Sequence, residues 1–342
     1  MTPPAAAPFT PPPILVAPDS FKGTLRAAQV AAAIAAGLER GGLVPPDVCP
    51  VADGGEGTLE VLLTALGGET AAAPATDALG RPIASAGFAL IEGGGTAIVE
   101  VAEASGLARI PEAERDAYAA TSRGTGELIV AAAAAGAEVV LVAAGGSATT
   151  DGGAGAIDAI EEAGGLQGTT LVVLCDVRTP FERAAAVFGP QKGADAKTVK
   201  RLTARLEKLA HTLPKDPRGQ PLTGAAGGLA GGLWAEYHAK LEPGAAFVLS
   251  ALDFDRRMRA AHAVIVGEGR LDATTLQGKI AGEIATRARQ AGVPCHAIAG
   301  QHALDPFGVR ILDLQVIAQA TTRAEIEQAA QALGERIAAR AV

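Results

Sequence analysis

Aromatic residues and runs of positive charge are both scarce in this chain. Its 342 residues include one Trp, two Tyr and eight Phe, although 49% of them are hydrophobic. The core must therefore be built from Ala, Val, Leu and Ile, as in helices packed closely on a parallel sheet. The formal net charge is −8, and Lys and Arg form no cluster. This excludes the electrostatic surface of a protein that binds nucleic acid or an anionic membrane, whereas a small anionic substrate needs only a local cationic pocket.

Cysteine is also scarce. The three cysteines, Cys49, Cys175 and Cys295, lie far apart in apolar segments that resemble strands. This spacing suits neither a disulfide framework nor a zinc site. We therefore expect three buried thiols in a protein of a reducing compartment.

Signals for export or membrane insertion are missing as well. Residues 1–13 are rich in Pro and Ala but lack the basic start and apolar stretch of a secretory signal, so we expect a disordered lead-in. The longest apolar stretch, residues 128–144, is interrupted by Gly136 and Glu138. Such an interrupted stretch is typical of a soluble α/β protein. We expect a cytoplasmic protein that does not bind membranes.

Short Val/Ile/Leu runs do recur, and they alternate with amphipathic segments rich in Ala, Glu and Arg. This alternation predicts parallel strands connected by helices, which is the α/β class. The expected strands are 14–17, 48–52, 97–101, 139–143, 171–175, 263–266, 296–299 and 314–318. The expected helices are 24–38, 58–66, 122–135, 198–213, 275–291 and 323–341.

The length of the chain exceeds what one hydrophobic core usually supports, so we predict two domains. Residues 1–72 and 253–342 are expected to form a Rossmann- or flavodoxin-like parallel-sheet domain. Residues 73–252 are expected to form an inserted second α/β domain. In open α/β sheets ligands bind at the carboxyl ends of the strands, and several expected strands end in polar, Gly-rich loops.

The strongest local signal is the segment GGSATTDGGAG at residues 145–155, between an expected strand and a helix-like segment. Glycines allow close backbone approach, and successive amides and hydroxyls can hold phosphate oxygens. A tight strand-to-helix turn with Ser or Thr caps is the alternative. The segment matches neither a Walker A loop nor the dinucleotide fingerprint, which argues against a dehydrogenase. The residues expected to bind the nucleotide phosphates are Gly145, Gly146, Ser147, Thr149, Asp151, Gly152 and Gly153.

The loop after the first expected strand carries Asp19, Ser20 and Lys22. Lys22 could neutralise a phosphate or a substrate carboxylate, and Asp19 could hold a metal or orient Lys22. We predict a catalytic and substrate-binding role for Lys22 and substrate binding by Asp19 and Ser20. A solvated surface lysine is the alternative for Lys22.

Further acidic strand ends carry Asp53, Glu56 and Glu268, which we predict as Mg²⁺ ligands, although each alone could be a helix cap or turn former. Arg270 follows Glu268 and could clamp a carboxylate or phosphate bidentately. We therefore predict that Arg270 binds the substrate.

Asp176 follows the apolar run 171–175, and Lys192 lies a short way downstream. A carboxylate at a strand end beside a pocket could accept the proton of an attacking alcohol, so Asp176 is the predicted general base. A buried aspartate that caps a turn is the alternative. Lys192 is a predicted substrate-binding residue. The five histidines show no metal-ligand spacing.

Taken together, these segments resemble the type I glycerate kinases of bacteria. The resemblance covers nearly the whole chain in order. It rests on APDSFKGT at 17–24, VADGGEGT at 51–58, VEVAEASGL at 99–107, ATSRGTGEL at 120–128, GGSATTDGGAG at 145–155, CDV at 175–177, VFGPQKG at 187–193, GAAGGL at 224–229 and GEGRLD at 267–272.

The resemblance implies ATP- and Mg²⁺-dependent phosphorylation of D-glycerate, usually at the 2-hydroxyl, in a cleft between two α/β domains. Thr150 and Thr179 stand where the family usually has Asn, and the segment between Gly155 and Leu171 is shorter than usual. The alternatives are formation of 3-phosphoglycerate, a kinase for another small hydroxy acid, and a two-domain protein that binds anions without chemistry. Either a monomer or a homodimer is compatible with the sequence.

Overall fold

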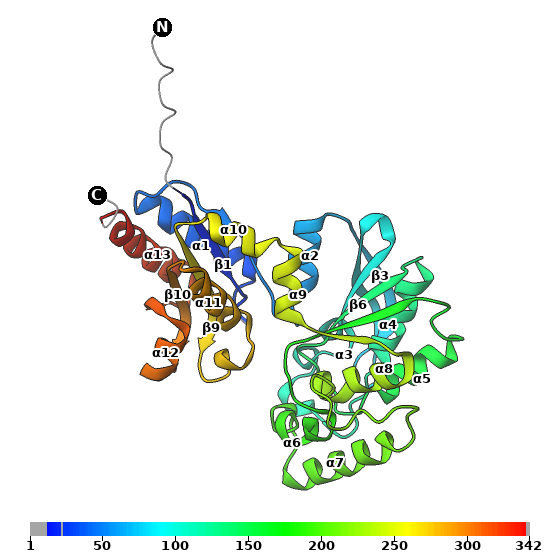
Figure 1. The fold of residues 1–342 in the computed structure, drawn as a ribbon. Coiled ribbons are helices and arrows are strands. Elements are labelled where there is room, and N and C mark those ends of the chain that lie inside the picture. The colour runs from blue at the N-terminus through cyan, green and yellow to red at the C-terminus, as the bar shows by residue number, and fades with distance from the viewer. Residues whose placement is uncertain (1–11, 22, 340–342) are drawn as a thin grey trace. The chain divides into compact units, whose positions relative to one another are not determined.

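The computed structural model describes residues 12–21 and 23–339, apart from the side chain of Gln277. Lys22 and most of the expected lead-in lie outside the described residues. The chain forms two compact units (Figure 1). The first unit takes residues up to Pro50, Asp253–Leu276 and the chain from Ala281 onward, and the second takes Val51–Leu252 and Gln277–Ile280.

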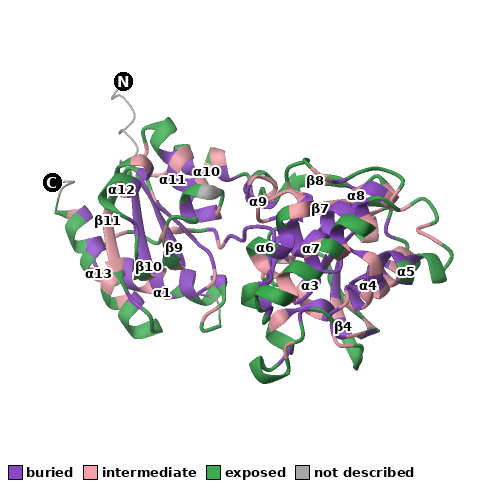
Figure 2. Cartoon of the chain, turned by 90° about the horizontal axis from the view of Figure 1, so that it is seen from below, coloured by how far each residue is buried: buried purple, intermediate pink, exposed green. Residues whose placement is uncertain are grey.

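The first unit contains a five-stranded sheet in which every pair is parallel. In spatial order its strands are β11 (Leu314–Gln319), β10 (Cys295–His302), β9 (Ala263–Leu271), β1 (Ile14–Pro18) and β2 (Asp47–Val48). The central strands β1, β9 and β10 carry continuous buried apolar runs, because helices cover both faces of such a sheet. Figure 2 shows β9 and β10 in the colour of buried residues.

The helices of this unit are α1 (Ala27–Arg40), α10 (Phe254–Ala260), α11 (Ile280–Ala291), α12 (Pro306–Leu312) and α13 (Arg323–Ala338). Helix α13 begins with a capping box, in which Thr322 and Glu325 each accept a hydrogen bond from the other's backbone amide. Helices α1 and α13 pack against each other. Gly37 permits this close contact, because a Cβ added there would lie 2.3 Å from the Glu327 carbonyl oxygen.

The second unit contains a six-stranded mixed sheet. Its strands, in spatial order, are β3 (Glu69–Thr76), β4 (Pro82–Ile91), β5 (Thr96–Glu100), β6 (Val139–Ala143), β7 (Thr170–Cys175) and β8 (Lys240–Pro243). Strands β3, β4 and β5 pair antiparallel, whereas β5 to β8 pair parallel. The carboxyl ends of the four parallel strands therefore share one edge of the sheet.

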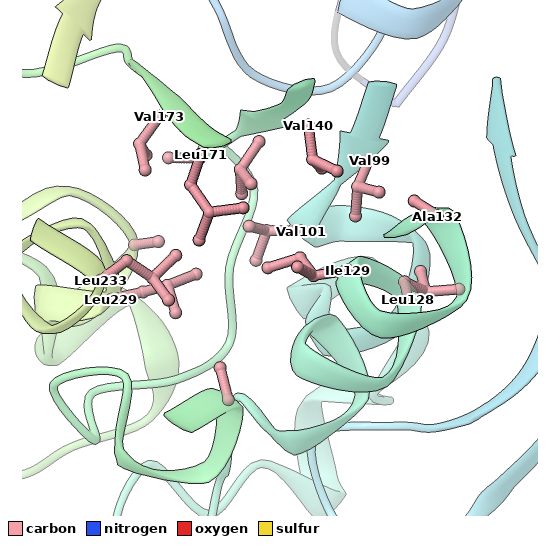
Figure 3. Close-up of a cluster of buried hydrophobic side chains, with 14 of the residues drawn as sticks. Val99, Val101, Leu128, Ile129, Ala132, Val140, Leu171, Val173, Leu229 and Leu233 are labelled. Carbon is pink, nitrogen blue, oxygen red and sulfur yellow. The ribbon is translucent and has the colours of Figure 1, made fainter. Parts of the chain in front are cut away.

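The described part of this unit contains eight α-helices. They are α2 (Thr58–Leu66), α3 (Val101–Ser105), α4 (Arg123–Ala134), α5 (Ala154–Glu162), α6 (Ala184–Phe188), α7 (Ala196–Ala210), α8 (Leu229–Tyr237) and α9 (Gly244–Ala251). The main core joins strand residues such as Val99 and Val140 to Leu128 of α4 and Leu229 of α8 (Figure 3). Aliphatic side chains make up most of this core, as the scarcity of aromatics predicts, and Phe88 is the one aromatic among its buried described residues.

The α/β class with two units is confirmed, and an observed strand overlaps each expected one. The strand expected at 48–52 is the shorter strand Asp47–Val48. The helix expected at 275–291 is a 3-10 turn at Thr275–Gln277 followed by α11, which starts at Ile280. The helix expected from Thr24 begins at Ala27. Strands β3, β4 and β8 were not expected.

The first boundary between the units also differs from the expected one. Residues 51–72, expected with the first domain, belong to the second unit. The reason is packing, since α2 contacts β4 and β5, and β3 pairs with β4. The three cysteines are buried and free, as expected. No helix within residues 12–21 and 23–339 is both long and apolar enough to span a bilayer.

Candidate active site

Three segments of the second unit meet at the carboxyl edge of its sheet. Strand β6 leads into Gly145, β7 leads into Asp176, and the segment Asp53–Gly57 lies beside both. A Cβ added to Gly145 would lie 2.5 Å from the Cα of Gly55 and 3.3 Å from Oδ2 of Asp176. Only glycine at both positions lets the two backbones approach this closely. The predicted base thus lies next to the predicted phosphate segment.

The two carboxylates of the Asp53–Gly57 segment lie close to that same Gly-rich segment. Oδ1 of Asp53 accepts a hydrogen bond from the Gly55 amide at 3.2 Å. Oε2 of Glu56 lies 3.8 Å from the position that a Cβ on Gly146 would occupy. Gly146 has a φ of 72° and is exposed, so its backbone is open to a ligand.

A buried ammonium group lies beneath the Gly-rich segment. Lys192 ends the short 3-10 helix Pro190–Lys192 and is 3% exposed. Its Nζ donates hydrogen bonds to Oγ of Ser147, at 2.9 Å, and to the carbonyl oxygen of Thr149. Burial lowers the pKa of Lys192 to about 8, although the charges of Asp151 and Asp176 act in the opposite direction. Lys192 thus places a buried amine next to Ser147 and Thr149 of the Gly-rich segment.

Asp151 is wholly buried, and its carboxylate accepts hydrogen bonds from other residues of the protein. Oδ2 accepts hydrogen bonds from the amide of Ser122 at 2.7 Å and from its hydroxyl at 2.9 Å, and Oδ1 accepts one from the Gly153 amide at 3.1 Å. These bonds tie the Gly-rich segment to the starts of α4 and α5. Asp151 therefore holds the shape of the segment through these bonds, and its predicted contact with a nucleotide phosphate stays a prediction.

The later glycines of the segment also serve local packing. Gly152 and Gly153 have φ values of 70° and 84°, which favour glycine. A Cβ on Gly152 would lie 2.5 Å from Cδ2 of Leu209. The segment therefore turns into α5 against α7, and its first residue, Gly145, lies beside Asp176. The Thr150 hydroxyl is buried and meets no hydrogen-bond partner among the described residues.

Glu100 belongs to this edge of the sheet, and sequence reasoning did not single it out. It ends β5 and is 6% exposed. Its Oε1 accepts hydrogen bonds from the amides of Gly57 at 2.9 Å and Leu59 at 2.8 Å. Burial raises the pKa of Glu100 to about 7, and the charges of Glu103 and Glu56 act in the same direction. The only sequence signal was its position at a strand end within the segment VEVAEASGL.

The remaining predicted residues lie in the first unit, at the carboxyl ends of β1 and β9. The Asp19 amide donates to the Gly267 carbonyl at 2.8 Å, so Asp19 lies beside the end of β9. Glu268 is buried and accepts a hydrogen bond from the Thr275 hydroxyl at 2.9 Å. Arg270 forms an ion pair with Asp272 at 3.1 Å. Asp19 and Ser20 thus follow the end of β1, whereas Glu268 and Arg270 lie within the last part of β9, because this strand runs on to Leu271 beyond the expected end at residue 266.

The predicted Mg²⁺ ligands are divided between the units, with Asp53 and Glu56 in one and Glu268 in the other. Among the described residues, no group of three or more His, Cys, Asp or Glu side chains is arranged to hold a metal ion. Mg²⁺ usually needs only one or two protein carboxylates, because phosphate oxygens and water complete its shell. Asp53 and Glu56, beside the Gly-rich segment, fit that requirement.

Comparison with known proteins gives the family. The model of the glycerate kinase family matches residues 14–164 and 161–341. The glycerate kinase of Bacillus subtilis is 39% identical, with 86% of this chain and 87% of that protein covered. The glycerate 2-kinase of Escherichia coli is 36% identical, with 84% of each chain covered.

A solved structure agrees with these relatives. A crystal structure from Salmonella typhimurium, provisionally assigned as glycerate kinase 2, is 32% identical to this chain. It superimposes with a TM-score of 0.78 over 96% of this chain and 98% of that one. The sequence match and the fold match both extend over nearly all of the chain, and this protein belongs to the glycerate kinase family.

Proposed function

We propose that this protein is an ATP-dependent kinase that phosphorylates D-glycerate at its 2-hydroxyl and so forms 2-phosphoglycerate. The observation that carries the proposal is the meeting of Gly145, Gly55, Asp176 and Lys192 at one edge of a sheet. Membership of the glycerate kinase family supports the reaction class. The name of the Escherichia coli relative, glycerate 2-kinase, supports the position of the phosphate on the product.

Phosphoryl transfer requires positioning and neutralisation of charge more than covalent chemistry by the protein. In the proposed site the backbone of Gly145, Gly146 and Ser147 holds the phosphates of ATP. The Thr149 carbonyl and the Ser147 hydroxyl fix the ammonium of Lys192 beneath them. Lys192 then offsets the negative charge of the phosphates or of the glycerate carboxylate.

Asp176 is the proposed general base. The 2-hydroxyl oxygen of glycerate forms a bond to the γ-phosphorus as the bond from that phosphorus to the bridging oxygen of ADP breaks. The proton of the hydroxyl passes to the carboxylate of Asp176, which lies beside Gly145. The proposed products are ADP and 2-phosphoglycerate.

Asp53 and Glu56 are the proposed Mg²⁺ ligands. A bound Mg²⁺ would offset charge on the phosphate oxygens. We also propose Asp19, Ser20 and Arg270, in the first unit, as substrate-binding residues. Glu268 accepts a hydrogen bond from the Thr275 hydroxyl in that unit, and we propose that it connects β9 to the turn that follows it.

Phosphorus NMR of the reaction of ATP with D-glycerate tests the proposal, because it distinguishes 2-phosphoglycerate from 3-phosphoglycerate. The expected result is stoichiometric formation of ADP and 2-phosphoglycerate that requires Mg²⁺. L-Glycerate, lactate and tartrate serve as controls for substrate range. Binding of glycerate without ATP consumption would instead support an anion-binding protein, and preference for another acid would reject glycerate as the substrate.

A further inference from the structure

The amino terminus of α2 lacks a local side-chain cap. Its N-cap residue is Gly57, which has a φ of 94° and no side chain to accept hydrogen bonds. The first amides of a helix have no acceptor within the helix itself. Here Glu100 supplies the acceptor, since one carboxylate oxygen takes the amides of both Gly57 and Leu59. The cap of α2 therefore comes from the end of β5, at the edge of the sheet.

The cap from β5 joins the start of α2 to the sheet by hydrogen bonds, which a cap within the helix itself cannot do. A Ser or Asp at the N-cap would satisfy the amides but would add no hydrogen bond between the start of α2 and the sheet. The Glu100 carboxylate joins the start of α2 to the strand end. The segment directly before α2 carries Asp53 and Glu56, and its Gly55 lies against Gly145. The position of these two carboxylates thus depends on where α2 begins.

We propose that Glu100 is a positioning residue, which holds the amides of Gly57 and Leu59 and thereby fixes Asp53 and Glu56 beside the Gly-rich segment. The expected effect of Glu100 on catalysis rests on the proposed function. The hydrogen bonds from Gly57 and Leu59 to Glu100 do not depend on that function. In the reaction, Glu100 acts through the Asp53–Gly57 segment and through no contact of its own with substrate. Its removal is therefore expected to affect the requirement for Mg²⁺ and ATP most.

Three variants of Glu100 and one control variant test whether this carboxylate positions the Asp53–Gly57 segment. Glu100→Ala removes the acceptor. Glu100→Gln keeps an oxygen for both amides, and Glu100→Asp shortens the side chain by one methylene. The control is Glu127→Ala, because Glu127 also accepts a backbone hydrogen bond, from the Thr76 amide at 2.7 Å, but lies on α4 and ties it to β3.

Hydrogen exchange read at single amides is the first measurement. In Glu100→Ala we expect exchange at Gly57 and Leu59 to accelerate about tenfold or more, as for a lost buried hydrogen bond, while Glu100→Gln stays within about threefold of the parent. Glu127→Ala should accelerate Thr76 alone. Unchanged exchange at Gly57 and Leu59 in Glu100→Ala would overturn the anchor.

Steady-state kinetics is the second measurement. Glu100→Ala and Glu100→Asp should raise the KM for ATP and the Mg²⁺ concentration for half-maximal rate about tenfold, with less effect on the KM for glycerate. In Glu100→Gln the KM for ATP and the Mg²⁺ requirement should stay within about threefold of the parent, and in Glu127→Ala both should be unchanged. Faster exchange with unchanged ATP and Mg²⁺ dependence would show a purely structural cap and overturn the positioning role.

Two outcomes remain to be separated. If Glu100→Ala does not fold, Glu100→Asp carries the test, and parental exchange and kinetics in that variant would overturn the proposal. If the parent protein shows no glycerate kinase activity, the proposed function fails, yet exchange at Gly57 and Leu59 and the calorimetric affinity for ATP with Mg²⁺ still measure the anchor and its effect.

Discussion

At the scale of single residues, the lowered pKa of Lys192 gives a prediction for the pH dependence of the proposed reaction. An ammonium with a pKa of about 8 is charged below that pH and neutral above it. If the charge holds an anionic substrate, kcat/KM for glycerate should fall as the pH rises through about 8. Lys192→Arg should be slower but should lose this decline, because a guanidinium stays charged. Lys192→Met should be inactive throughout, and a parental profile in Lys192→Met would remove Lys192 from the site.

The lowered pKa of Lys192 also makes the free energy of unfolding depend on pH. Its folded-state pKa, about 8, lies below the ordinary 10.5, so the unfolded chain binds more protons between these values. The free energy of unfolding contributed by Lys192 therefore rises with pH across this window and is lowest below it. Urea titrations of the parent and Lys192→Met at several pH values measure the difference. A parent that loses stability relative to Lys192→Met between these pH values would contradict the assignment.

Asp176 is the second residue that single substitutions test. Asp176→Asn should lower kcat about a hundredfold or more and leave the affinity for ATP nearly unchanged, as expected for loss of a general base. Asp195→Asn is the matched control, since Asp195 is an exposed aspartate that caps α7 by accepting the Thr198 amide. Calorimetry and single-turnover rates give the two quantities. Equal single-turnover rates in Asp176→Asn and the parent would exclude Asp176 as the base.

Sequence reasoning could place residues on strand ends, but it could not assign their partners. Gly145 and Asp176 were expected at one edge of the second domain because parallel strands end together, whereas Asp53 was expected in the first domain. The roles of Asp151 and Glu100 depend on distant amides, 29 residues away at Ser122 and 43 residues away at Gly57. No local pattern marks such pairs, so a buried anchor and a ligand-binding carboxylate look alike in sequence.

At the scale of elements, the buried parallel strands could be predicted and the edge strands could not. Strands such as β6 and β9 are apolar on both faces and appear as continuous runs. Strand β3 reads ETAAAPAT and is largely exposed, and β8 reads KLEP. Ala, Pro, Glu and Lys have low strand propensity, so pairing with neighbouring strands decides their conformation.

Packing of α1 on α13 gives a prediction at this scale. Gly37→Ala raises helix propensity by about 1 kcal/mol, but its Cβ would lie 2.3 Å from the Glu327 carbonyl oxygen. The cost of overpacking should exceed the gain in helix propensity and lower the free energy of unfolding by about 1–3 kcal/mol. Ala32→Gly, at an exposed position of α1, is the control that changes propensity alone. Urea denaturation measures both, and a stabilised Gly37→Ala would refute the contact.

At the scale of the whole molecule, the length of the chain predicted two domains and the alternation of segments predicted the α/β class, but the first boundary depended on tertiary contacts. Residues 51–72 include a Gly–Gly pair that resembles a linker, whereas α2 belongs to the second unit through β4 and β5. The boundary therefore falls before Asp53, and the Asp53–Gly57 segment shares a unit with the Gly-rich segment.

The cysteines provide a reporter for each unit. Cys49 and Cys295 lie in the first unit and Cys175 in the second, next to Asp176, and burial raises the pKa of all three thiols. Pulsed thiol labelling along a urea gradient, read by mass spectrometry, should find them unreactive until their own unit unfolds. ATP with Mg²⁺ should shift the labelling midpoint of Cys175 upward, since a ligand at a hundred times its Kd stabilises the native unit by about 2.7 kcal/mol. A shift confined to Cys49 and Cys295 would place the nucleotide on the first unit and reject the phosphate site at Gly145–Ser147.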